Sequence, residues 1–150
     1  MELQFQPATE ADVPEVAAMM ADFYAIDGYA FDAHRSETNL QLFVRNPELG
    51  RLWLLLWGEE VIGYAALTFC FSFEFGGKTA FLDELYLVPE CRGKGLGKQA
   101  VAFVCRQARK EGVQAVHLEV ELHNGPGRRL YGRVGFREHN RILMTWHSTE

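Results

Sequence analysis

The sequence has few cysteines, and none lies in a spacing typical of a metal site or a disulfide framework. Cys70, Cys91 and Cys105 are an odd number without a CxxC pair, which argues against paired disulfides and a zinc site. The five histidines also lack an HxH or HxxxH pair, so no metal is expected. Unpaired thiols indicate a reducing compartment, and the cytoplasm is therefore the expected location.

Long hydrophobic runs and an excess of positive charge are also absent. No apolar stretch approaches the ~18 residues of a membrane span, and residues 1–12, MELQFQPATEAD, lack the basic and apolar regions of a signal peptide. The formal net charge is −5, whereas nucleic-acid-binding proteins usually carry a basic face. Neither membrane nor nucleic acid is expected as a partner, and the acidic balance favours a cationic small molecule.

What is present is enough apolar sequence for one domain. The chain has 150 residues, of which 48% are hydrophobic, and no linker or repeat divides residues 1–150. Apolar periodicity, caps and turns predict helices at 8–26, 37–46, 95–111 and 124–134. They predict strands at 3–7, 51–57, 61–73, 79–88, 114–122, 136–140 and 141–147. An antiparallel meander followed by a helical crossover and a parallel strand indicates a mixed α/β sheet.

A glycine-rich, basic turn follows the predicted strand at 79–88. Gly93, Gly95 and Gly97 allow positive φ angles and close approach of a ligand. The helix that begins directly after them offers free N–H groups and the positive end of its dipole. The turn therefore predicts a polyphosphate site, with positive charge from Arg92, Lys94 and Lys98.

The spacing of this turn argues against two common nucleotide motifs. A Walker A loop requires glycine where Arg92 stands and Ser or Thr where Gln99 stands. The dinucleotide fingerprint requires a third glycine at the position of Lys98. Residues 92–97 instead match the pattern [RQ]-x-x-G-x-[GA].

A second motif, NGPGRRLYGRVGF, occupies residues 124–136. It matches N-x-x-[AS]-x-x-x-Y-x-x-x-G-F at Asn124, Tyr131, Gly135 and Phe136, with Gly127 where Ala or Ser is usual. The two motifs together resemble those of the GNAT superfamily of N-acetyltransferases, and the order of elements is similar along the whole chain. The motifs and the Phe-rich segment 66–78 look most like the diamine (polyamine) acetyltransferase branch.

The resemblance implies a single-domain GNAT fold and acetyl-CoA as co-substrate. The expected fold is a mostly antiparallel twisted sheet with flanking helices and a parallel strand pair at the coenzyme A site. A homodimer is a further implication. Asn124 is also expected to cap its helix. By resemblance, the coenzyme is held through the main chain of Leu85, Tyr86 and Leu87, the turn formed by Arg92, Gly93, Lys94, Gly95, Leu96, Gly97 and Lys98, and the motif residues Asn124 and Gly127.

Three side chains are candidates for catalysis. By resemblance Tyr131 is the general acid, because a phenol of pKa about 10 stays protonated at neutral pH. The alternative is a packed aromatic on an amphipathic helix. Asp83 and Glu84 are candidate bases for the amine, and a salt bridge to an arginine is the alternative for each. Strand alternation places Asp83 with Phe81, Leu85 and Leu87, and Glu84 with Leu82 and Tyr86, unless a bulge reverses the faces.

The expected function is acetyl-CoA-dependent N-acetylation of a primary amine on a small cationic molecule, by direct attack. Cys91 has no base partner in sequence, which argues against a covalent acyl-cysteine. Two alternatives stay open, a non-catalytic acyl-CoA-binding or regulatory module and an enzyme that acetylates protein N-termini or lysines. The alternation around Glu119 and Glu121 favours a solvated face over an acceptor site. A stripe of Phe69, Phe71, Phe73 and Phe75 favours a core or subunit interface over a ligand site.

Overall fold

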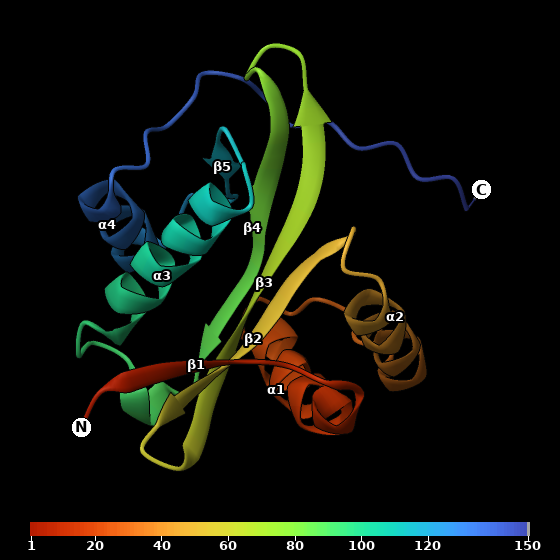
Figure 1. Ribbon diagram of the computed structural model, residues 1–150, viewed down its shortest axis with the longest axis vertical. Coiled ribbons are helices and arrows are strands. Elements are labelled where there is room, and N and C mark those ends of the chain that lie inside the picture. Colours follow the sequence, from red (N-terminus) through yellow and green to blue (C-terminus); the bar gives the residue numbers. More distant parts are fainter. Residues whose placement is uncertain (150) are drawn as a thin grey trace.

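A five-stranded sheet forms the centre of the computed structural model, which describes residues 1–149 (Figure 1). Neighbouring strands are antiparallel from β1 to β4, whereas β4 and β5 are parallel. The mixed α/β fold with a parallel pair is therefore confirmed. In spatial order the strands are β1 (Leu3–Pro7), β2 (Gly50–Trp57), β3 (Glu60–Ser72), β4 (Gly77–Leu87) and β5 (Val116–His117).

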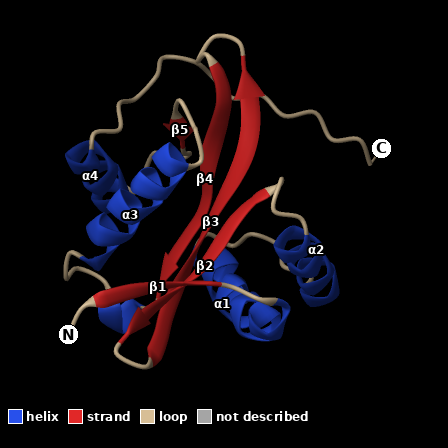
Figure 2. Ribbon diagram, in the orientation of Figure 1, coloured by secondary structure: helices blue, strands red, loops and turns tan. Residues whose placement is uncertain are grey.

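Helices cover both faces of the sheet (Figure 2). α1 (Val13–Ile26) and α2 (Ala33–Arg45) pack on one face, and α3 (Leu96–Lys110) and α4 (Gly125–Val134) on the other. Short 3-10 turns at Glu10–Asp12 and Pro89–Cys91 precede α1 and α3. The continuous apolar run in β2 explains this layering, because Leu52 and Leu54 join the core under α1 and α2 while Trp53 and Leu55 join the core under α3.

Capping residues set the ends of the helices that carry the two sequence motifs. The Asn124 side chain accepts a hydrogen bond from the Gly127 N–H at 3.0 Å, which confirms it as the cap of α4. Gly95 precedes α3 in the left-handed region, and Gly112 follows it with the same φ of 80°. α2 begins at Ala33 rather than at residue 37, because Asp32 caps it by accepting from the Arg35 N–H.

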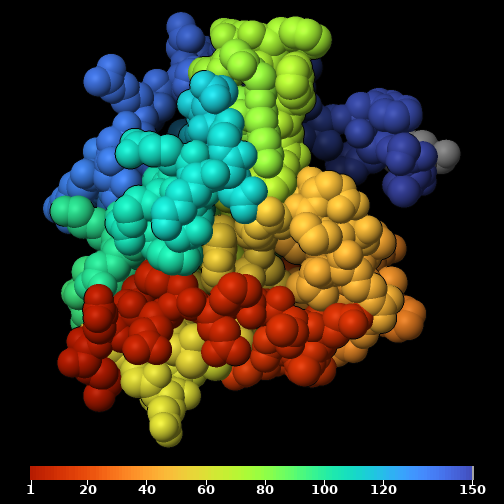
Figure 3. Space-filling view, in the orientation of Figure 1, coloured from red at the N-terminus to blue at the C-terminus, as the bar shows by residue number. Residues whose placement is uncertain are grey.

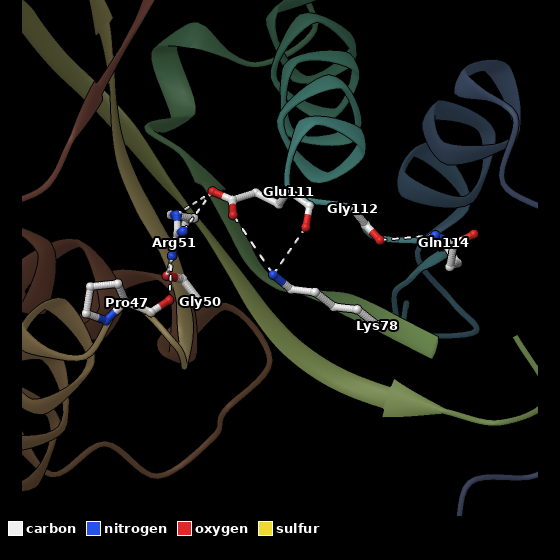
Figure 4. Close-up of polar contacts among 7 residues, drawn as sticks. All are labelled: Pro47, Gly50, Arg51, Lys78, Glu111, Gly112 and Gln114. Carbon is white, nitrogen blue, oxygen red and sulfur yellow. Dashed lines mark hydrogen bonds and ion pairs between the residues drawn. The ribbon is translucent and has the colours of Figure 1, made fainter. Parts of the chain in front are cut away.

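An ionic cluster ties the end of α3 to the sheet (Figure 4). The Glu111 carboxylate accepts a hydrogen bond from Arg51 Nε of β2 at 2.8 Å and lies 3.9 Å from Lys78 Nζ of β4. The Gln114 N–H then donates to the Lys78 carbonyl at 2.8 Å. These contacts hold the segment after α3 against the edge of β4, and β5 then pairs with β4.

The predicted strands near the end of the chain are not formed. Residues 136–140 and 141–147 contain no strand, and the strand predicted at 114–122 is reduced to Val116–His117. A strand requires a hydrogen-bonding neighbour, and β4 pairs with β5 only through Ala80–Val116 and Phe81–His117. None of the helices in residues 1–149 combines the length and apolar character that a membrane span requires.

Candidate active site

A cavity of about 620 Å³ opens where β4 and the segment after β5 diverge. It is lined by the end of α1, the turn after it, β4, the segment after β5 and α4. Five of the predicted catalytic and coenzyme-binding residues meet here, although they come from two separate segments, β4 and the motif that forms α4. They are Asp83, Glu84, Leu85, Asn124 and Tyr131.

A β-bulge at Asp83 decides how the two strand carboxylates point. In the β3–β4 pair Ala66 lies opposite Glu84 and Leu67 lies opposite Leu82, so Asp83 is the extra residue. The bulge reverses the alternation, because Leu82 and Leu85 now pack in the same core, under α3. The predicted pairing of Glu84 with Leu82 on one face is therefore wrong.

Glu84 lies under α1 and both its carboxylate oxygens are engaged. The hydroxyl of Tyr24 donates to Oε2 at 2.5 Å, and the hydroxyl of Tyr64 donates to Oε1 at 2.7 Å. Burial raises the pKa of the Glu84 carboxyl, and the two tyrosine hydrogen bonds oppose that rise. Burial and the nearby carboxylate also raise the pKa of both tyrosines, so their hydroxyls remain donors. Sequence reasoning missed Tyr24 and Tyr64, which read as ordinary core positions.

Asp83 has the opposite environment. Within residues 1–149 its carboxylate has no hydrogen-bond or ion-pair partner, and burial raises its pKa above the usual range. The salt bridge to an arginine that the sequence left open forms for neither Asp83 nor Glu84 in the described chain. Of the two carboxylates, Asp83 is the one available to take a proton.

Tyr131 lies on α4 with its ring partly buried. The ring meets Phe136 edge-on with 6.0 Å between the centroids, and it packs against the core under α3. The same side chain lines the cavity, so the packed-aromatic alternative and a position at the site both apply. Burial raises the pKa of the phenol, which keeps the hydroxyl protonated well above neutral pH.

The glycine-rich turn has the properties of an anion site. Gly93 and Gly95 have φ angles of 73° and 80°, and a Cβ on either would meet no atom within 4 Å. No side chain caps the first turn of α3, so its N–H groups are available to a ligand. Lys94 and Lys98 are exposed beside it. These features fit a pyrophosphate group.

Three other residues of this turn have structural roles. Arg92 Nε donates to the Leu87 carbonyl at 2.8 Å, and its guanidinium lies 5.4 Å from the centre of the Tyr86 ring. The Leu96 side chain is buried in the core, so it offers a ligand only its main chain. A Cβ at Gly97 would approach Leu130 of α4 to 3.3 Å, and this glycine therefore permits the close packing of α3 and α4.

The formally charged side chains that line the cavity are all carboxylates. Asp27, Glu119 and Glu121 join Asp83 and Glu84. Glu119 is exposed, in agreement with the expected solvated face, and Glu121 is partly buried; both also line the cavity. Glu121 accepts a hydrogen bond from the Tyr29 hydroxyl, and Asp27 lies 3.3 Å from His123 Nε2. Because the strand ladder stops at His117, the alternation that suggested a solvated face does not apply beyond it.

A second cavity of about 230 Å³ lies on the other side of the same residues. It is bounded by α1, α2 and strands β2 to β4, and Tyr24, Asp83 and Glu84 line both cavities. Its floor is mostly apolar, with Leu40 and Phe43 from α2. The hydrogen-bonded Tyr24–Glu84 pair therefore stands between the two spaces.

Comparisons with known proteins agree with this architecture. Residues 16–136 match the model of the acetyltransferase (GNAT) family. The chain is 24% identical to aminoalkylphosphonate N-acetyltransferase of Salmonella typhimurium, over 90% of this chain and 85% of that protein. It is 30% identical to thialysine N-epsilon-acetyltransferase of Sus scrofa, over 61% of this chain and 52% of the relative. An integron cassette protein from the Cole Harbour salt marsh metagenome, 33% identical, has a structure with TM-score 0.87, covering 98% and 91% of the two chains.

Proposed function

The chain belongs to the acetyltransferase (GNAT) family, and from this premise we propose that it transfers an acetyl group from acetyl-CoA to the primary amine of a small cationic molecule. Residues 1–150 would act as one N-acetyltransferase domain. One observation carries the proposal. The protonated phenol of Tyr131 and the unpartnered carboxylate of Asp83 line the same cavity, and every formally charged side chain of that cavity is acidic.

The coenzyme would be held by the glycine-rich turn and the exposed edge of β4. Acetyl-CoA supplies the activated acetyl thioester. The N–H groups at the start of α3, with Lys94 and Lys98, would bind its pyrophosphate. The main chain of Leu85–Leu87 lies on the β4 edge that β5 leaves unpaired, so it can hydrogen-bond an extended ligand.

The acceptor amine must lose a proton before it attacks. An amine of pKa about 10 is mostly protonated at pH 7. Asp83 is proposed as the base, because its carboxylate has no partner within residues 1–149 and desolvation raises its pKa above the ordinary value of 3.8. Glu84 is proposed as a positioning residue, because Tyr24 and Tyr64 occupy its oxygens.

The proton for the departing thiolate is assigned to Tyr131. Its pKa is raised, so the hydroxyl is present as a donor throughout the neutral range. The ring is held against Phe136 and the core, which limits the directions in which the hydroxyl can point. Asn124 and Gly127 would contact the coenzyme at the start of α4. Glycine is needed at position 127, because a Cβ there would lie 2.5 Å from Asn124 Nδ2.

The acidic lining of the cavity supports a polyamine-like acceptor. The resemblance of the sequence motifs to the diamine (polyamine) acetyltransferase branch suggests the same class of acceptor. Five carboxylates concentrate negative potential in one cavity, which favours an acceptor with more than one positive charge. A relative is named for N-epsilon-acetylation of thialysine, which supports an amine acceptor. An aminoalkylphosphonate would bring an anionic phosphonate into the same acidic cavity, so that class is disfavoured here.

A thiol-release assay with acetyl-CoA and a panel of amines tests the proposal. The panel should contain diamines, polyamines, thialysine, aminoalkylphosphonates, aminoglycosides and short peptides. Diamines or polyamines are expected to give the highest kcat/KM. Absence of turnover on every member, with acetyl-CoA binding intact, would instead support a non-catalytic acyl-CoA-binding module. Preference for peptides would support acetylation of proteins.

A further inference from the structure

The smaller cavity is a space in the core between α2 and the sheet. Its floor is apolar, because Leu40 and Leu52 are only 6% exposed and Phe43 packs against the same core. A small side chain of β3 contributes to the space, since Ala66 lies directly opposite Leu52 of β2 and Glu84 of β4. Close-packed cores leave few voids larger than a water molecule, so a cavity of about 230 Å³ points to a binding site.

One end of this cavity is acidic. Asp83 and Glu84 are the formally charged side chains of its lining within residues 1–149. The Glu84 oxygens accept hydrogen bonds from Tyr24 and Tyr64, whereas the Asp83 carboxylate has no such partner in the described chain. An unpartnered carboxylate beside apolar surface is stabilised by a cation that hydrogen-bonds to it. A ligand of this cavity should therefore carry a positive charge at one end.

The size and lining of the cavity fit a compact amine. An apolar cavity of about 150 Å³ is enough to bind benzene, so 230 Å³ has room for an aromatic ring with a short alkyl arm. The ring would lie against Leu40, Phe43 and Leu52, and the ammonium group at the end of the arm would reach Asp83. The Tyr24 ring lines the same space and can add a cation–π contact.

The smaller cavity is reached from a different side of the molecule than the coenzyme site. Figure 3 shows the segment that carries α2, in orange, on one side, and α3 and α4, in teal and blue, on the other. Ser36 and Asn39 of α2 line the cavity, and Asn39 is exposed while Ser36 is partly exposed. A ligand can therefore enter beside α2 without passing the glycine-rich turn at the start of α3.

We propose that the smaller cavity is a second amine-binding site, selective for a primary amine with a compact hydrocarbon body. The body lies on the apolar floor, and the ammonium group hydrogen-bonds the Asp83 carboxylate. The larger cavity, lined by five carboxylates, suits an acceptor with several positive charges. The smaller cavity suits one charge at the end of an apolar group. The two cavities thus select different classes of amine and share one carboxylate.

Sharing Asp83 links this site to the proposed reaction. An ammonium group bound from the side of α2 would pair with the carboxylate that is proposed as the base. A compact amine in the smaller cavity would then disfavour a polyamine in the larger one, because two cations would meet at the same carboxylate. This link rests on the proposed function, whereas the binding of the compact amine does not.

Isothermal titration calorimetry without acetyl-CoA tests the site with 2-phenylethylamine and its uncharged analogue 2-phenylethanol. The parent protein should bind the amine at least about tenfold more tightly than the alcohol, because a hydrogen bond to a charged group discriminates at this level. Asp83→Asn should remove most of this preference, since the alcohol and the amine then meet a neutral amide.

Two variants that narrow the cavity locate the ligand. Ala66→Leu fills the space between Leu52 and Glu84, and Ser36→Leu narrows the cavity from the partly exposed side of α2. Each should weaken binding of both ligands by about tenfold or more, with circular dichroism confirming the fold. Glu119→Gln is the matched control, because Glu119 lines the larger cavity alone. It should leave both affinities unchanged.

Three results would overturn the second site. One is a parent protein that binds no 2-phenylethylamine at about 10 mM ligand. Another is binding that Glu119→Gln weakens and that neither Ala66→Leu nor Ser36→Leu affects, because the amine would then occupy the larger cavity. Equal affinity of the parent for the amine and the alcohol would contradict pairing with Asp83. Acetyl transfer is not measured, so failure of this site and failure of the proposed function are separate outcomes.

Discussion

At the scale of single residues, one inserted position determines the roles of two adjacent acids. The bulge leaves Asp83 without a partner, while Glu84 accepts hydrogen bonds from two tyrosines. Both acids could be identified from the sequence, because charges in an apolar strand are unusual. Their roles could not be separated there, because a bulge leaves the local apolar pattern unchanged and appears only when β3 is paired with β4.

Asp83→Asn is expected to lower kcat by about a hundredfold or more, because it removes the general base. Glu84→Gln should lower kcat much less than Asp83→Asn does, because the Glu84 carboxylate already has two hydrogen-bond partners. Steady-state kinetics with a saturating amine compare the two variants. Equal losses in kcat would contradict the assignment of Asp83 as base.

Tyr131→Phe is expected to lower kcat by a factor of 10² or more, with little change in the KM for acetyl-CoA. The ring can keep its contact with Phe136, so the thermal midpoint should stay close to that of the parent protein. Full activity of this variant across the neutral pH range would refute its role as general acid.

The two adjacent carboxyls of β4 also predict how stability depends on pH. Burial raises the folded-state pKa of Asp83 and Glu84 above their ordinary values of 3.8 and 4.5. Between each ordinary value and its raised value the folded chain binds more protons than the unfolded chain. The contribution of these groups to the free energy of unfolding therefore falls as pH rises through this window.

Urea unfolding of the parent protein and of Asp83→Asn/Glu84→Gln at several pH values measures this contribution. Relative to the parent, the double variant should lose less stability as pH rises from about 4 toward 7, because neutral amides do not titrate. Parallel pH curves for the two proteins would show that the carboxyls titrate alike in the folded and unfolded chains.

At the scale of elements, local signals predicted helix ends better than they predicted strands. A cap or a left-handed glycine acts within a few residues, so the ends of α3 and α4 follow from Gly95, Gly112, Asn124 and Gly135. A strand depends on a neighbour that can be distant in sequence. Residues 118–122 and 141–147 have strand patterns but no ladder in the single chain, and the pattern alone could not show that.

Gly95→Ala tests the turn before α3. Alanine at a φ of 80° is expected to destabilise the fold by about 1 kcal/mol, and it also places a methyl group in the proposed pyrophosphate site. The KM for acetyl-CoA should rise severalfold. Gly112→Ala is the matched control, because Gly112 has the same φ of 80° and an equally open surrounding at the other end of α3.

Gly112→Ala should reproduce the loss of stability without the rise in KM. The two effects are separated by combining urea unfolding with steady-state kinetics. A similar KM for acetyl-CoA in both variants would show that the turn before α3 has no special part in holding the coenzyme.

At the scale of the whole molecule, the acidic cavity is a tertiary property. Its carboxylates come from the end of α1, from β4 and from the segment after β5. The net charge of −5 indicated a cationic partner only in general terms. No window of the sequence brings Asp27 beside Glu121, so the cavity could not be predicted from composition or motifs.

This concentration of charge predicts a dependence on salt. Raising the ionic strength from about 0.01 M to about 1 M shortens the screening length from roughly 30 Å to roughly 3 Å. The kcat/KM for a diamine should fall severalfold across this range, and that for a monoamine of similar length should fall less. Stopped thiol-release assays at constant pH measure both. Identical salt dependence for the two amines would contradict steering by the acidic cavity.

The wall shared by the two cavities has a consequence for inhibition. The 230 Å³ cavity reaches Tyr24, Asp83 and Glu84 from the side of α2, whereas the glycine-rich turn lies at the start of α3 on the opposite face of the sheet. A compound that fills the smaller cavity would contact Tyr24, Asp83 and Glu84 without entering the coenzyme site. Its inhibition would be noncompetitive with acetyl-CoA, and it would offer selectivity over acetyltransferases in which this cavity is closed.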